Sequence, residues 1–296
     1  MSAPFGPRKF GLSLSRAVRR AGKRALRRGV EGQPARLQAV EHAWRAEALE
    51  PRILMSGDPL SVAAGGYGAQ QVELRFAQGD GNRIVQVFVG DAQQGSDYNI
   101  NANGNLITVE GGGSSDQIKI KLVFGAGFDA TGIGLSVDGL VGEDSVQLDW
   151  AGAIQLDELS VSSEQINLGA ATNVSESLTV AHDVELLAAS SVTGGTASVT
   201  LTQGITAGGS LIVSASAVHE TTSGSASTAS VSVGGDLVAS TVDIDAIVTR
   251  SLIDSSLGLA NYDFGDAIAS LSVADGVDIT ADNVDLAATV EGAVRM

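Results

Sequence analysis

Five polar residues, three of them acids, are placed where an outward row of side chains could act on a sugar. Each follows an apolar residue that we predict to point inward, so the five should project outward: Gln147, Asn167, Glu185, Asp243 and Asp285. Hydrolysis of a glycoside needs two carboxyl groups about 5–10 Å apart, in a groove that holds the sugar. The chemistry that these residues could perform is therefore the cleavage of a polysaccharide.

The residues that would hold a polysaccharide beside these acids are missing from the sequence. No Lys or Arg stands between Lys121 and Arg250, so an anionic sugar would be repelled, and Trp150 is the only Trp after residue 52. We therefore predict a solvated acidic wall that keeps the protein soluble, and no enzyme. A polysaccharide-acting enzyme is the alternative.

Two turns that combine glycine with aspartate indicate a second chemistry, calcium binding. Residues 111–118 read Gly-Gly-Gly-Ser-Ser-Asp-Gln-Ile, and residues 139–146 read Gly-Leu-Val-Gly-Glu-Asp-Ser-Val. Both resemble the calcium-binding nonapeptide of RTX proteins, which makes Asp116 and Asp144 calcium candidates. Each copy has lost one glycine, and residues 119–138 separate the two copies, which in RTX proteins follow each other directly. We therefore expect weak calcium binding at most, and favour plain glycine turns with a solvated aspartate.

Other reactive constellations are absent from the sequence. There is no Cys, which excludes disulfides, thiolate metal sites and Cys nucleophiles. The three histidines, His42, His182 and His219, lie in unrelated segments. No serine sits in a G-x-S-x-G motif, and no glycine-rich loop carries the Lys-Ser/Thr of a P-loop. We expect no catalytic residue and no cofactor.

Short strands must position all of these residues. From residue 63 to residue 296, apolar and polar residues alternate, and Gly, Asp and Asn turns divide the runs. Pairs of inward apolar residues begin at positions that are 20, 18, 58 and 42 residues apart, which fits a repeat of roughly 20 residues. Leu211 lies off this register. The pairs are Val146/Leu148, Ile166/Leu168, Val184/Leu186, Val242/Ile244 and Val284/Leu286.

This repeat predicts an all-β fold, a parallel β-helix with roughly 20 residues in each coil. Alternate side chains would stack into a narrow column with room for small and β-branched residues. Such a column explains why 44% of the residues are hydrophobic and only 4% are aromatic. Antiparallel β-sandwich repeats are the alternative, because the strands predicted within residues 71–122 partly fit hairpin spacing.

Charge divides the chain into two parts. Residues 1–52 carry a net charge of +8, and the remaining residues carry −24. The acidic body excludes nucleic acid as its partner, because phosphate binding needs a basic surface. We expect the leader, residues 1–48, to be partly helical or disordered. Residues 14–28 have the pattern of a basic amphipathic helix, which suits contact with an anionic membrane or with export machinery.

The boundary between the two parts is Leu49-Glu50-Pro51-Arg52-Ile53-Leu54-Met55-Ser56. With residues up to 60, this segment resembles the LEPR-XLL motif of very large, repetitive bacterial surface and secreted proteins, Met55 replacing the second Leu. The resemblance implies a sorting motif, an extracellular or cell-surface location and an adhesin-like function. Because the last strand is followed by no polar cap, we expect the β-rich segment 63–296 to be truncated at its C-terminus.

These observations favour a non-enzymatic structural or adhesive module, the N-terminal part of a large exported surface protein. It would serve as a stalk or contact surface for an unidentified surface or glycan ligand. The alternatives are a β-helix enzyme that acts on polysaccharide and an RTX-like calcium-binding module.

Overall fold

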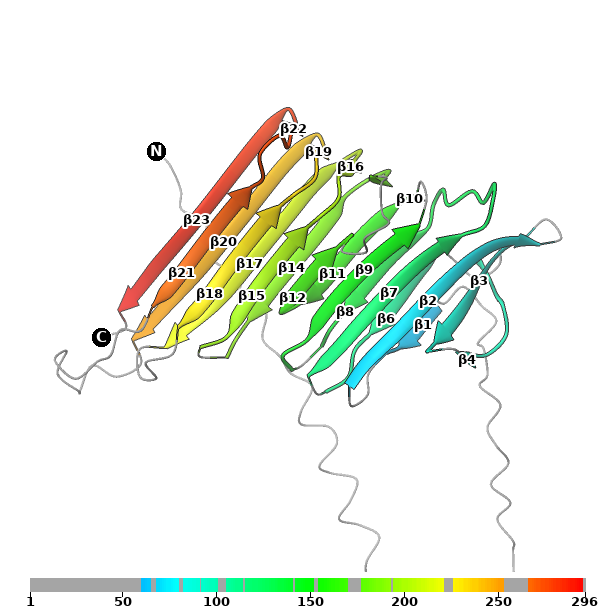
Figure 1. Cartoon of the computed structure of the whole chain (residues 1–296), viewed down its shortest axis with the longest axis horizontal. Coiled ribbons are helices and arrows are strands. Elements are labelled where there is room, and N and C mark those ends of the chain that lie inside the picture. Colours follow the sequence, from blue (N-terminus) through cyan, green and yellow to red (C-terminus); the bar gives the residue numbers. More distant parts are fainter. Residues whose placement is uncertain are drawn as a thin grey trace, which may run out of the picture. The chain divides into compact units, whose positions relative to one another are not determined.

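A computed structural model of the chain describes a β-rich body (Figure 1). The described residues are 60–64, 68–79, 82–90, 92–100, 105–113, 115–140, 142–151, 154–169, 177–192, 194–220, 226–252 and 266–294. The predicted leader and the motif Leu49–Ser56 lie outside them. All elements of the described part are β-strands, which confirms the all-β class.

The largest continuous run of parallel pairing is an eight-stranded sheet, called sheet A. All of its strands are parallel, and neighbours in the sheet come from successive passages of the chain. Its strands lengthen from four residues in β1 to twelve in β20 and β23. In spatial order they are β1 (Leu60–Ala63), β6 (Leu106–Glu110), β8 (Gly134–Asp138), β11 (Glu158–Ser163), β14 (Val184–Ser190), β17 (Ser210–Glu220), β20 (Thr241–Leu252) and β23 (Asn283–Val294).

Two further sheets complete the body. Sheet B has ten strands in the order β21 (Ala267–Val273), β18 (Ser227–Val233), β15 (Thr196–Leu201), β12 (Gln165–Leu168), β9 (Ser145–Ala151), β7 (Asp116–Phe124), β2 (Gly68–Gly79), β3 (Asn82–Val89) and β4 (Ala92–Gln93), with β5 (Tyr98–Asn99) paired to β3. Sheet C has the order β10 (Ile154–Leu156), β13 (Leu178–Val180), β16 (Ile205–Ala207), β19 (Leu237–Val238) and β22 (Ile279–Thr280).

From β8 onward the chain visits sheets A, B and C in turn, and we call one such passage a circuit. Backbone groups of each strand pair with those of the circuits before and after it, so successive strands stack in parallel. Antiparallel pairing among the described strands is confined to β2, β3, β4 and β5. The run of hairpins that a β-sandwich would need is therefore not seen among them.

Alternation of side chains builds one core between the sheets. In β14 the side chains of Val184, Leu186 and Ala188 are buried, whereas that of Glu185 is exposed. The same two-residue period places buried Val, Ile, Leu and Ala on every sheet, because successive residues of a strand point to opposite faces. Aromatic packing is local: the rings of Phe76 and Phe124 stack with centroids 4.4 Å apart.

The uniform repeat predicted from the sequence is wrong for most circuits. Val146 does pair with Ile166, as the repeat requires. The next partner of Ile166 in sheet B is Val199, however, and not Val184. Val184 belongs to sheet A, where it pairs with Leu159 and with Leu211, the residue that we placed off register. The step from one strand of sheet A to the next also lengthens toward the end of the chain, where Val242 pairs with Val284.

The error has a physical cause. Inward alternation is the same on all three sheets, so the pattern of apolar residues does not reveal to which sheet a strand belongs. The connections between strands also differ in length from one circuit to the next. The column that we predicted therefore combined strands of sheet A with strands of sheet B.

The two ends of the stack differ. At the end that contains β1, additional buried side chains come from the hairpin strand β3 and the segment after it: Val85, Tyr98 and Ile100. At the other end, β21, β22 and β23 are the last strands of their sheets. Val284 and Leu286 of β23 align with buried Val242 and Ile244, as predicted for inward positions. Their side chains are 48% and 42% exposed, because β23 is the last described strand of sheet A.

Candidate functional site

The two glycine-aspartate turns lie directly on top of each other. Asp116 begins β7 and Asp144 directly precedes β9, and Gln117 pairs with Ser145. Glu164 directly precedes β12 in the next circuit, because Gln165 also pairs with Ser145. The two turns are far apart in the sequence but lie in consecutive layers of the stack. Asp116, Asp144 and Glu164 therefore form a single column, which we call the acidic column.

Hydrogen bonds tie this acidic column together from one circuit to the next. The N–H of Gly112 donates to Oδ2 of Asp116 over 2.7 Å, and the N–H of Asp116 donates to Oδ1 of Asp144 over 2.6 Å. The N–H of Asp144 in turn donates to Oε2 of Glu164 over 2.8 Å. The carboxylates of Asp144 and Glu164 thus accept N–H groups from the strand starts of the preceding circuit, and that of Asp116 accepts an N–H group of its own turn, which stabilises the corner.

Both aspartates of the column are buried, whereas Glu164 is partly exposed, which corrects the interpretation of Asp116 and Asp144 as solvated turn residues. Asp116 is 0% exposed and Asp144 is 1% exposed, and Oδ2 of Asp144 is buried without a hydrogen-bond partner. Burial raises the pKa of the Asp144 carboxyl; the hydrogen bond from Asp116 lowers it, and the carboxylates of Asp116 and Asp138 raise it. Burial is also the largest cause of the raised pKa of Glu164.

The raised pKa of Asp144 leads to a prediction of how stability depends on pH. A carboxyl whose pKa is higher in the folded than in the unfolded protein stabilises the fold when it is protonated. That stabilisation is lost as the pH rises from about 4, the ordinary carboxyl value, through the raised pKa. The asparagine of D144N does not titrate, so the stability of D144N should fall less than that of wild type as the pH rises. The urea midpoint of D144N should therefore increase relative to the wild-type midpoint across this range. Urea titrations across this range measure it, and parallel curves for the two proteins would contradict it.

Calcium binding at Asp116 and Asp144 stays a prediction. Among the described residues, no group of three or more His, Asp or Glu side chains is arranged to hold a metal ion. Three of the carboxylate oxygens in the column already accept backbone N–H groups, and a metal would have to compete with these hydrogen bonds.

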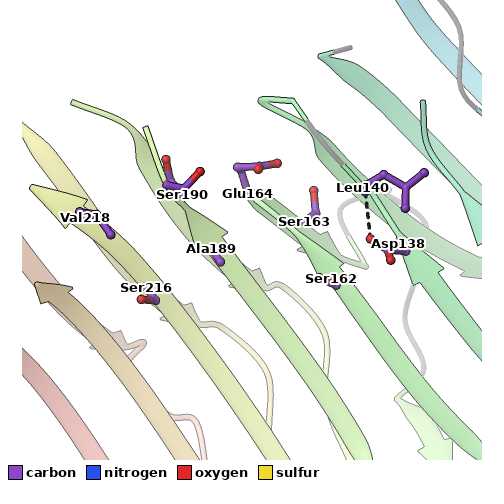
Figure 2. Close-up of a pocket in the computed structure, with 10 residues that line it drawn as sticks. Asp138, Leu140, Ser162, Ser163, Glu164, Ala189, Ser190, Ser216 and Val218 are labelled. Atoms are coloured by element: carbon purple, nitrogen blue, oxygen red, sulfur yellow. Dashed lines mark hydrogen bonds between the residues drawn. The ribbon is translucent and has the colours of Figure 1, made fainter. Parts of the chain in front are cut away.

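A polar groove lies beside the acidic column, across the carboxyl ends of β8, β11, β14 and β17 (Figure 2). Its volume is about 330 Å³. The sequence prediction missed it, although the recurrence of Ser and Asp at strand ends was a usable signal. Its lining is rich in hydroxyl groups and includes Asp138, Leu140, Ser162, Ser163, Glu164, Ala189, Ser190, Ser191, Ser216 and Val218.

Hydroxyl and carboxylate groups give the groove donors and acceptors without any positive charge. Within the groove wall, Oδ1 of Asp138 accepts the N–H of Leu140 over 2.9 Å, which holds Leu140 in a left-handed conformation with φ of 67° (Figure 2). Such a lining suits hydrogen bonding to a neutral, hydroxyl-bearing ligand. Its lining residues include no aromatic ring on which a sugar could stack.

The outward polar residues do not form the single row that we predicted. Glu185, Asp243 and Asp285 lie in register on sheet A, with Ile212 between the first two. Gln147 and Asn167 pair with each other on sheet B instead. Burial is the first cause of a raised pKa at Asp245, and the carboxylates of Asp243 and Asp285 contribute further. No basic residue aligns with Asp243 or Asp285 in this ladder.

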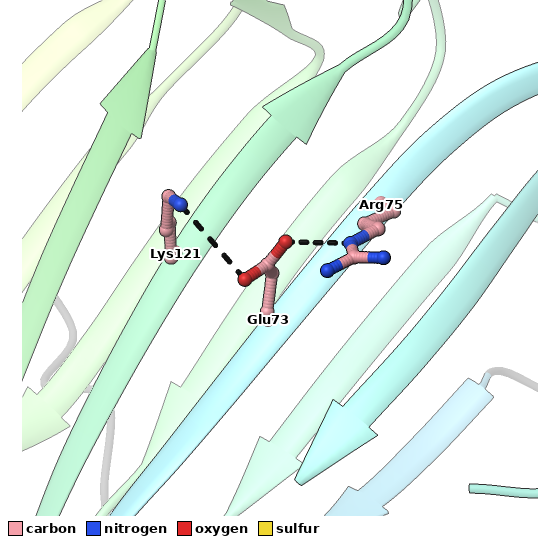
Figure 3. Close-up of polar contacts among 3 residues, drawn as sticks. All are labelled: Glu73, Arg75 and Lys121. Atoms are coloured by element: carbon pink, nitrogen blue, oxygen red, sulfur yellow. Dashed lines mark hydrogen bonds and ion pairs between the residues drawn. The ribbon is translucent and has the colours of Figure 1, made fainter. Parts of the chain in front are cut away.

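Arg75 of β2 and Lys121 of β7 lie on either side of Glu73 on the outer face of sheet B (Figure 3). Nε of Arg75 lies 2.6 Å from Glu73, and Nζ of Lys121 lies 3.8 Å from the other oxygen of the same carboxylate. Arg75 also covers the ring of Phe88 at 4.0 Å. These contacts neutralise part of the positive charge, so the patch is a poor binding site for phosphate.

The histidines in the described part do not converge. His182 is exposed and lies 3.1 Å from Asp157, whereas His219 is buried and its Nδ1 lies 3.2 Å from Oγ of Ser227. His182 lies in the connection between β13 and β14 and His219 lies in β17, and each contacts a different partner, so the two do not form a catalytic pair. His42 lies outside the described residues.

Comparisons with known proteins supply no family for the chain. No family model, no curated protein and no solved structure matches it. Among the described residues, no helix is long and apolar enough to cross a membrane.

Proposed function

We propose that this chain is a non-enzymatic structural module of the parallel β-helix type, the N-terminal part of a large exported surface protein. The observation that carries the proposal is the repeated A, B, C order of strands joined by parallel pairing. The circuits differ in length and do not form a uniform coil. Examples are the circuit from Gly134 to Glu158 and the longer one from Val242 to Val284. Proteins built in this way form stiff supports whose faces carry contacts.

The stack is well suited to a load-bearing or contact role. Its apolar core continues from circuit to circuit, and the acidic column adds side-chain hydrogen bonds between circuits. The hydroxyl-lined groove offers a neutral glycan a place to bind, which supports an adhesive surface. The resemblance of Leu49–Ser56 to LEPR-XLL supports export to the cell surface.

The location is tested by following an epitope-tagged chain in the cell that encodes it. We expect external protease to remove the tag from intact cells. A variant that lacks residues 49–56 should stay inside, whereas one that lacks an equal stretch of the leader, residues 30–37, serves as the control for shortening. A full-length protein that remains protected inside the cell would contradict the export role.

The absence of catalysis is tested separately on a panel of neutral and acidic polysaccharides. We expect no new reducing ends and no unsaturated products, because no basic residue is in register with Asp243 or Asp285 in the outward ladder. Turnover that disappears in D243N or D285N would support the enzyme alternative instead.

A further inference from the structure

Three phenylalanine rings meet near the carboxyl ends of β2 and β7, although only 4% of the residues are aromatic. Phe76 and Phe124 are partners in the register of these two strands, and their rings stack with an interplanar angle of 8°. The ring of Phe128 lies 5.5 Å from that of Phe76 and 5.7 Å from that of Phe124. Because these two distances are nearly equal, Phe128 lies beside the stacked pair and not on the face of Phe124 that points away from Phe76.

A pocket of about 260 Å³ lies next to these rings. Phe124 and Phe128 line it, whereas Phe76 does not. The rest of its lining includes Ile154 of β10 and Thr179 of β13, and both strands come after β7 in the chain. Phe76 belongs to β2, which precedes β7 in the stack, so Phe76 covers one face of the Phe124 ring and the pocket lies on the other side.

Polar groups surround the two rings of the pocket. Gln155 and Thr179 also line it and are partners in the register of β10 and β13. Asp129, which is exposed, lines it from the segment after β7, and its Oδ1 accepts the N–H of Thr131 over 2.9 Å. Hydrogen bonds from Thr131 lower the pKa of Asp129, which keeps this carboxyl ionised. The segment is held against β3, because Nη1 of Arg83 donates to the carbonyl groups of Asp129 and Thr131 over 3.3 Å and 2.5 Å.

We propose that this pocket binds one ring of a neutral, β-linked glucan, at a site separate from the hydroxyl-lined groove and independent of the export role. The hydroxyl groups of such a ring are all equatorial, so its faces present C–H groups, which carry slight positive charge. These stack on the negative face of an aromatic ring, here that of Phe124.

The rim and the size of the pocket fit the same ligand. A carboxylate, an amide and a hydroxyl supply acceptors and donors for the sugar hydroxyls, and all three are present in Asp129, Gln155 and Thr179. The volume is somewhat below the range of about 300–1,000 Å³ that holds drug-sized ligands, which suits a single sugar ring. The ionised Asp129 repels a second carboxylate, so we expect a neutral sugar and not a uronic acid.

Saturation-transfer NMR with cellotetraose, a neutral β-linked tetramer of glucose, tests the aromatic platform. We expect transfer from the protein to the ring C–H protons of cellotetraose, and none to the equivalent tetramer of glucuronate. F124L keeps an apolar side chain but removes the ring, so the dissociation constant of cellotetraose should rise about 2- to 10-fold. F88L removes a partly exposed ring from β3 and is the matched control, which should bind like wild type.

The rim provides a second variant that does not touch the core. Gln155 is exposed, so Q155A should fold like wild type and weaken binding about 2- to 10-fold through a lost hydrogen bond. Q165A, which truncates an exposed glutamine of β12, should leave binding unchanged, and so should S216L, which fills the hydroxyl-lined groove. A wild-type protein that shows no transfer to cellotetraose, binding unchanged in both F124L and Q155A, or binding lost in S216L would each overturn the proposal.

Discussion

Replacing Ile244 with aspartate is expected to destabilise the protein severely. Ile244 is 0% exposed in the middle of β20, between Val213 of β17 and Leu286 of β23. The substitution would bury an unpaired carboxylate in an apolar column, at a cost on the order of 4 kcal/mol or more. The denaturation midpoint in urea, with circular dichroism as the signal, measures the loss.

Asp243 is the matched control for Ile244. It is the preceding residue of the same strand and points to the outer face, so D243N should change the free energy of unfolding by at most about 0.5 kcal/mol. Similar losses in I244D and D243N would mean that the alternation of inward and outward positions in β20 is wrong.

A second large effect is expected from Gly111→Ala. A methyl group at Gly111 would overlap the backbone carbonyl of Gly139 in the next circuit, and the N–H of Gly111 is held there by the carbonyl of Asp138. Neither backbone can move without separating the stacked turns. We expect a loss of about 2–3 kcal/mol in the free energy of unfolding, the usual cost of overpacking.

Gly113 lies two residues further along the same turn and provides the comparison. A methyl group there would meet nothing within 4 Å, so Gly113→Ala should be neutral or stabilising by up to about 1 kcal/mol through the unfolded chain. Because the two variants make the same chemical change, their difference isolates the stacking of turns 111–118 and 139–146. Equal midpoints for G111A and G113A would show that these turns do not touch.

The fold class could be predicted from the sequence because alternation within a strand is a local property. Val184, Leu186, Val242 and Ile244 were assigned to inward positions, and all four are buried. The partner of each strand was not predictable by the same means. Pairing depends on the length of the connections, and Leu211 lies in register although a uniform repeat excludes it.

The acidic column also shows that the sequence does not reveal which segments become neighbours. The sequence singled out Asp116 and Asp144 for their glycine neighbours, and the structure brings them together as consecutive members of one column. Their burial could not be foreseen, because an aspartate beside glycines in a turn is usually solvated. Glu164 has no glycine-rich context at all, and only the pairing of Gln165 with Ser145 places it in the column.

The lengthening of sheet A strands gives the stack a direction. Strand β1 spans four residues, β14 seven, β17 eleven and β20 twelve, so the ladder of backbone hydrogen bonds grows along the stack. Local opening in a stacked fold is opposed mainly by the adjacent circuits, so short ladders should open more often than long ones. Amide protons should therefore exchange with solvent fastest around β1 and β6 and slowest around β20. A pulling force on the chain would accordingly unfold the circuits with short sheet A strands first, and those with long strands would unfold last.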